Sequence, residues 1–216
     1  MKKFLKIVGV IILLIILVAL IHTLRNFIIV QKLNKNFAKY ESSSNYNIKI
    51  HSVQEETTVD VDHYKKDNRQ VTILKRYYKD EENKMSAYNN GDKIDIFWET
   101  NNYKTAQLDA NAMIEIGLYN GLEADNSWQT LLSCICAKIR STTYNEKECY
   151  YIDNFFSPKT MSGTDTNKLY IEKETGLCIK LIVDNQTSQK EYNFENVDDT
   201  VFEEPDITQY TLQENK

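Results

Sequence analysis

Residues 7–21 read IVGVIILLIILVALI, and this stretch decides how the whole chain is laid out. Thirteen of its fifteen residues are Leu, Ile or Val, and none is charged. Flanking apolar residues extend the segment to the roughly 20 residues that cross a 30 Å hydrocarbon core at 1.5 Å per residue. The run predicts a transmembrane helix within residues 1–25, with one domain of ordinary size following it.

A cleaved signal peptide is the alternative interpretation, because its basic and apolar regions look similar. Cleavage needs small residues at positions −3 and −1, and no such pair occurs in residues 18–23, which read VALIHT. No cysteine follows the apolar run directly, which disfavours a lipid-modified N-terminus. The sequence therefore favours an uncleaved anchor.

The charges around the apolar run bear on its orientation. Lysines precede it at positions 2, 3 and 6, which favours a cytoplasmic N-terminus and places the domain outside the cell membrane. Basic residues also follow it, and they work against this orientation: Arg25, Lys32, Lys35 and Lys39.

A second helical pattern follows in residues 26–45, where the chain enters the domain. Its apolar residues recur at helical spacing, with the lysines between them, and residues 41–45 end the pattern. The apolar positions are Phe27, Ile28, Val30, Leu33 and Phe37. They predict a helix that packs on the domain, and the alternative is a helix that binds a partner.

Residues 46–210 carry the signals of a mainly β domain, and residues 211–216 form a polar tail. Alternating strands are predicted around residues 46–50, 59–64, 71–78, 94–99 and 103–108, and again across residues 139–197. Asn90-Gly91 predicts a type I′ hairpin, and Gly176 fits the left-handed position of another turn.

Two helices interrupt the strands. The longer is capped by Asn126 and carries one apolar stripe, formed by Trp128, Leu131, Leu132, Ile135 and Ile139. A shorter one is expected at residues 112–119.

Composition and motifs exclude several functions. The net charge of −5 lacks the basic stripe that nucleic acid requires. No spacing of His22, His51 and His63 suggests zinc, and the sequence predicts neither metal nor cofactor.

Asp60 and Asp62 share a strand face and could pair as carboxylates, but with residues 80–82 they more often mark a solvated surface. Residues 165–167 lack the other ligands of a calcium loop. No catalytic residue is predicted, and the chain is not expected to be an enzyme.

Four cysteines allow several pairings. Cys134 and Cys136 lie two apart on a predicted helix and should not pair with each other. The most plausible disulfide joins Cys149 and Cys178 in the C-terminal strands, and buried free thiols are the equal alternative.

Residues 168–205 resemble the end of the bacterial lipoprotein-carrier (LolA-like) superfamily. The run LYIEKETGL at residues 169–177 is followed by IKL at 179–181, by YNFENV at 192–197 and by DDTVFEEP at 198–205. The order of elements is similar from Phe27 to Pro205. The resemblance implies an α+β fold, mainly β, in which an antiparallel half-barrel sheet carries helices on its concave face. In that family the cavity holds acyl chains, but this chain has its own membrane span and no arginine that aligns with the family's gating arginine.

Two functions are consistent with these patterns. The first is a membrane-anchored binding protein that holds a lipid or other apolar ligand beside the membrane. The expected lining is Ile94, Ile96 and Trp98 from the sheet, with Trp128, Leu131, Leu132 and Ile135 from the helix; the alternative is that these residues simply form the core. The second function is a regulatory module that docks on an envelope protein and has no small-molecule ligand.

Overall fold

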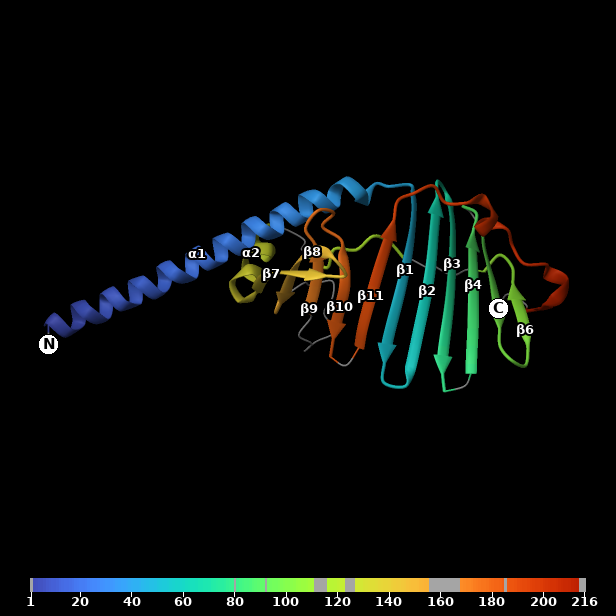
Figure 1. Ribbon diagram of the computed structural model, residues 1–216, viewed down its shortest axis with the longest axis horizontal. Helices are drawn as coiled ribbons and strands as arrows, with labels where there is room; N and C mark the ends of the chain where they lie inside the picture. Colours follow the sequence, from blue (N-terminus) through green and yellow to red (C-terminus); the bar gives the residue numbers. More distant parts are fainter. Residues whose placement is uncertain are drawn as a thin grey trace. The chain divides into compact units, whose positions relative to one another are not determined.

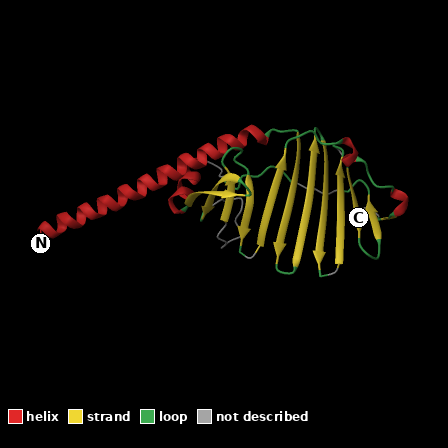
Figure 2. Cartoon of the chain, in the orientation of Figure 1, coloured by secondary structure: helices red, strands yellow, loops and turns green. Residues whose placement is uncertain are grey.

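The computed structural model describes residues 2–79, 81–91, 93–110, 116–122, 127–155, 168–184 and 186–213. The chain forms two compact units. The first comprises Met1–Lys39 with Asn120–Cys178, and the second comprises Tyr40–Tyr119 with Ile179–Lys216. Helices contribute more residues than strands to the first unit, strands dominate the second, and strands exceed helices over the described chain, which confirms the mainly β prediction (Figure 2).

The first helix, α1, runs without a break from Lys2 to Glu41 (Figure 1). Its most apolar 18-residue window has a mean hydropathy of 3.1, and none of that window is buried. A helix with this length and this bare apolar surface fits a single-pass membrane anchor. Its end at Glu41 also confirms the predicted stop.

The last part of α1 is amphipathic. Four residues are buried at spacings of four, three and four: Asn26, Val30, Leu33 and Phe37. This stripe confirms that the helix packs on the domain, and Lys32, Lys35 and Lys39 are exposed as predicted. Phe27 is only half-buried and Ile28 is exposed, because they lie beside the stripe.

The first unit combines α1 with α2 (Ser127–Cys136) and three antiparallel strands. The strands are β7 (Lys138–Tyr144), β8 (Lys147–Asp153) and β9 (Lys168–Glu172), in the order β9-β8-β7. After β9 the chain turns at Gly176, which has φ +73° and so confirms the predicted left-handed position. A Cβ at Gly176 would collide with the backbone of Leu33 and Phe37, so the absence of a side chain lets this turn lie against α1.

The second unit is an open sheet. Its members are β1 (Asn45–Gln54), β2 (Thr57–Lys66), β3 (Arg69–Tyr78), β4 (Glu81–Asn89), β5 (Ile94–Glu99), β6 (Lys104–Gln107), β10 (Cys178–Val183), β11 (Gln186–Asn193) and β12 (Thr211–Leu212). They follow the order β12-β6-β5-β4-β3-β2-β1-β11-β10. The pairings are antiparallel except that between β12 and β6, so the antiparallel prediction is confirmed.

Three local predictions differ from the structure. The sequence does not predict β4 as a separate strand, since its residues EENKMSAYN alternate poorly. Asn90 and Gly91 do lie between β4 and β5, but of these two only Gly91 has positive φ (+100°), so they are not the central pair of a type I′ turn. Residues 116–120 are in neither helix nor strand, whereas residues 112–115 of the expected short helix, the Asn126 cap and residues 165–167 lie outside the described ranges.

The two faces of the second unit's sheet differ. On one face Val71, Tyr88 and Phe97 pack against Val197 and Phe202, so the chain after β11 covers part of this face. Phe202 belongs to a short helix, η2 (Asp199–Phe202). The opposite face carries a smaller cluster of Ala87, Ile96 and Ala110. The face that Val197 and Phe202 partly cover also carries, outside their cluster, the site described next.

All four cysteines are free thiols in the structure, and Cys134, Cys149 and Cys178 are buried. The structure thus has the buried free thiols and not the Cys149–Cys178 disulfide. The Cys149 thiol instead donates a hydrogen bond to the carbonyl oxygen of Lys147, with its Sγ 3.3 Å away.

Candidate functional site

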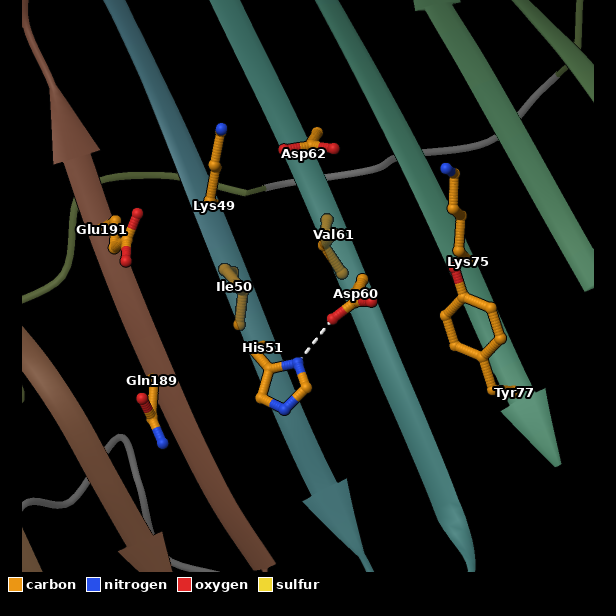
Figure 3. A pocket seen from close by; sticks show the side chains of 10 residues that line it. All are labelled: Lys49, Ile50, His51, Asp60, Val61, Asp62, Lys75, Tyr77, Gln189 and Glu191. Atoms are coloured by element: carbon orange, nitrogen blue, oxygen red, sulfur yellow. Dashed lines mark hydrogen bonds and ion pairs between the residues drawn. The ribbon is translucent and has the colours of Figure 1, made fainter. Parts of the chain in front are cut away.

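A polar groove of about 460 Å³ lies on one face of the second unit's sheet (Figure 3). Four neighbouring strands, β11, β1, β2 and β3, line it. Eight of its ten lining residues have polar side chains: Lys49, His51, Asp60, Asp62, Lys75, Tyr77, Gln189 and Glu191. The other two, Ile50 and Val61, alternate with them along β1 and β2. The groove is therefore a charged surface and not an apolar cavity.

Strand register brings these side chains together. Lys49 lies directly between Glu191 on β11 and Asp62 on β2. One step along the strands, Asp60 lies between His51 on β1 and Lys75 on β3. Because successive side chains of a strand point to opposite faces, positions two apart on each strand fall on the same face. The result is two rows of polar side chains: Glu191, Lys49 and Asp62 alternate in charge in one, and Gln189, His51, Asp60 and Lys75 form the other.

Only one pair in the groove is bonded among the residues that the structure describes. His51 Nδ1 lies 2.6 Å from Asp60 Oδ1, a hydrogen bond between half-exposed side chains. Within the described part of the chain, no ion pair involves Lys49, Lys75, Asp62 or Glu191. Lys49 and Glu191 are exposed, and Asp62 and Lys75 are half-buried.

The groove lacks the parts of common catalytic sites. None of its lining residues is a serine, threonine or cysteine that His51 could activate. No group of three metal-ligating side chains occurs among the residues that the structure describes. The predicted sharing of one strand face by Asp60 and Asp62 is confirmed. His63, the next residue along β2 after Asp62, points to the opposite face and does not join them.

His63 is the most unusual titratable group of this unit. It is fully buried, its Nδ1 lies 2.9 Å from Thr72 Oγ1, and its Nε2 has no hydrogen-bond partner among the described residues. The ring of Tyr46 lies 6.0 Å away, centroid to centroid. Burial, followed by the charge of Lys65, lowers the pKa of His63 from 6.5 to about 4. His63 is therefore neutral at physiological pH.

This burial predicts a loss of stability in mild acid. In the unfolded chain His63 has its ordinary pKa near 6.5. Between pH 6.5 and 4 the unfolded chain therefore protonates His63 while the folded chain keeps it neutral, which favours unfolding. The free energy of unfolding of the full chain in detergent should fall by about 2 kcal/mol from pH 7 to pH 5 through this group. Urea unfolding followed by tryptophan fluorescence measures it.

Two histidine variants provide the control for this prediction. A His63→Gln variant should lose most of the pH dependence, whereas a His51→Gln variant should keep it, since His51 is exposed. Equal pH dependence in the wild type and the His63→Gln variant would contradict the assignment to His63.

The residues predicted to line an apolar ligand fall in two places. Ile94, Ile96 and Trp98 do share one face of β5, where they pack with Ala87 and Ala110. The helical residues belong to α2 in the first unit: Trp128, Leu132 and Ile135 are exposed and Leu131 is half-buried. Ile139, expected both on this stripe and at the start of a strand, lies in β7 and is buried, which confirms the strand.

Sequence reasoning misses most of the groove residues. It names only His51, Asp60 and Asp62, and it interprets the two aspartates as a solvated face and finds no metal site at His51. Lys49, Gln189 and Glu191 meet because β1 pairs with β11, which is more than 130 residues away along the chain. The alternation of polar residues on β1 and β2 is the only local signal.

Comparison with known proteins gives no family. No family model matches the sequence, and no curated protein matches it. Among solved structures, an uncharacterized conserved protein from Thermus thermophilus is similar at 10% identity, over 85% of this chain and 98% of that one, with a TM-score of 0.46.

MucB is similar at 9% identity over 82% of this chain and 62% of its own length, with a TM-score of 0.38. A DUF1329 family protein from Desulfovibrio piger is similar at 8% identity, over 84% and 97% of the two chains, with a TM-score of 0.33. At these TM-scores the likeness assigns neither a family nor a function to this chain, and the LolA-like resemblance stays a prediction.

Proposed function

We propose that this protein is a membrane-anchored interaction module without catalytic activity, whose charged groove binds a segment of a partner protein. The anchor is α1, and the domain is placed outside the cell membrane in keeping with the lysines that precede the span. The observation that carries the proposal is the pair of polar and charged rows across β11, β1, β2 and β3.

The chemistry of the groove favours a polypeptide over an apolar ligand. Pockets for small apolar ligands are lined mainly by hydrophobic side chains, whereas here polar side chains predominate. Complementary charges give protein interfaces their specificity and fast association. Asp62 and Glu191 flank Lys49, so this row offers two carboxylates to one ammonium group. We therefore expect a partner segment whose basic side chains lie over this row.

Photo-crosslinking in the native cells tests the proposal. A photoreactive residue at Gln189, inside the groove, should yield one stoichiometric adduct. The same residue at Tyr103, which is exposed elsewhere in this unit, serves as the matched control and should yield none. Reversing the acidic row with Asp62→Lys and Glu191→Lys should reduce the adduct roughly tenfold or more, since like charges across an interface cost several kcal/mol.

Equal adducts at Gln189 and Tyr103, or an adduct that survives the charge reversal, would rule out the groove as the docking surface. Binding of a lipid or other apolar ligand remains the second prediction from the sequence. Lipid in stoichiometric excess in a mass spectrum of the purified full-length protein would favour it over the interaction module.

A further inference from the structure

Helix α2 buries small side chains and exposes large apolar ones, the reverse of a surface helix in a soluble domain. Its buried residues are Thr130, Ser133 and Cys134, all small. Its largest apolar side chains are exposed: Trp128 by 66%, Leu132 by 48% and Ile135 by 52%. A helix that buries small side chains and leaves tryptophan, leucine and isoleucine bare presents an apolar face to its surroundings.

The same helix is tied to α1 at the end of the apolar run. The side-chain amide of Asn26 donates hydrogen bonds to the carbonyl oxygens of Cys134 (3.1 Å) and Ala137 (2.8 Å). His22 Nε2 also lies 3.1 Å from the Ala137 oxygen. Asn26 is fully buried, so this attachment belongs to the packed part of the first unit.

This attachment sets the depth of α2. Asn26 follows Ile21, the last residue of the apolar run, by five positions, which is about 7.5 Å of helix at 1.5 Å per residue. The polar interfacial layer on each side of a bilayer is about 5–7 Å thick. The run itself covers only about 22 Å of the 30 Å core, so the core extends past its ends. If α1 spans the membrane, Asn26 and the C-terminal end of α2 are therefore held within that layer.

The exposed apolar surface of α2 resembles that of the anchor, which is also formed by large apolar side chains. Leu20, Ile21 and Leu24 of α1 are exposed at the same end of the span. Tryptophan is enriched where the hydrocarbon meets the headgroups, because its ring is apolar and its N–H is polar.

We propose that α2 is a second membrane contact, which lies at the surface of the bilayer that α1 crosses and inserts Trp128, Leu132 and Ile135 into the boundary between headgroups and acyl chains. The proposal depends on the anchor and is independent of the groove. Both α1 and α2 would then attach the first unit to the bilayer, and α2 would act like the interfacial helices of peripheral proteins.

Quenching of tryptophan by brominated lipid tests the contact. The full-length chain carries two tryptophans, Trp98 and Trp128, so a Trp98→Phe background leaves Trp128 as the reporter. In vesicles of phosphatidylcholine with a minor fraction of phosphatidylglycerol, bromine near the headgroup end of the acyl chains should lower the emission of Trp128 by roughly half, as expected for an interfacial ring. Bromine near the chain terminus should quench it less.

Two further variants make the result decisive. A Leu132→Asn, Ile135→Asn pair in the same background should reduce the quenching severalfold, while Ser127→Ala, an exposed polar position of α2, should leave it unchanged. Leu20→Trp in a chain without its other tryptophans reports insertion of α1, because Leu20 is exposed in the span.

Quenching of Trp128 together with the Leu20→Trp reporter supports the contact. Quenching of the Leu20→Trp reporter alone overturns it and points to protein, a partner or a second copy, on the α2 face. Absence of quenching at both positions overturns the anchor and the interfacial helix together, and it leaves the groove proposal to its own crosslinking test.

Discussion

Replacing Ile12 and Ile16 with arginine should release this protein from the membrane. Both residues lie in the middle of the apolar run and are exposed on α1. Each arginine at the centre of a span costs about 2.5–3.5 kcal/mol, and each lost isoleucine removes a further 0.3–0.6 kcal/mol or so. The thirteen Leu, Ile and Val residues of the run contribute about 4–8 kcal/mol to insertion on the same scale. The double variant therefore loses nearly all of the driving force.

Carbonate extraction of the membrane fraction measures this effect. The wild type should stay in the pellet and the double variant should move to the supernatant. A control that replaces the same two residues with leucine keeps the apolar surface and should remain in the pellet. Sequencing of the mature N-terminus distinguishes the anchor from a cleaved signal peptide, and a chain that begins after His22 would contradict the anchor.

Replacing Gly176 with alanine should destabilise the first unit by about 2–5 kcal/mol. The backbone there has φ +73°, which costs an L-residue about 1–2 kcal/mol. The new Cβ would also collide with the Leu33 carbonyl oxygen and lie 2.8 Å from the Phe37 nitrogen, and such overpacking costs about 1–3 kcal/mol. Because both neighbours are backbone atoms of α1, neither can move without shifting the helix.

Gly91 provides the matched control for Gly176. Its φ is also positive, at +100°, but no atom lies within 4 Å of a Cβ built there. Gly91→Ala should therefore cost only the backbone contribution, about 1–2 kcal/mol. Urea unfolding of the two variants in detergent measures the difference. Equal losses would show that the turn at Gly176 does not press against α1.

Much of the secondary structure can be predicted from the sequence because its signals are local. Alternation along β5 identifies the shared face of Ile94, Ile96 and Trp98, and one run of apolar residues identifies α1. The failures are local as well. The irregular sequence of β4 hides a strand, and Asn90-Gly91 suggests a turn type that Asn90 does not adopt.

The candidate site cannot be predicted in the same way. His51 and Asp60 meet only because β1 and β2 pair in one particular register, and Glu191 reaches Lys49 only through the pairing of β1 with β11. A shift of one residue in either register would send these side chains to opposite faces. Similarly, the apolar stripe of α2 suggests a lid over a ligand, because periodicity shows that a helix has an apolar face but not what that face meets.

The sequence by itself determined that this chain has an apolar segment long enough to span a bilayer, followed by a mainly β domain, since both properties follow from the order of neighbouring residues. Only the tertiary structure decided which polar residues share the groove, that His63 is buried away from it, and that α2 is tied by Asn26 to the end of the apolar run. Those facts depend on strand register and on contacts across more than 100 residues, which no local pattern specifies.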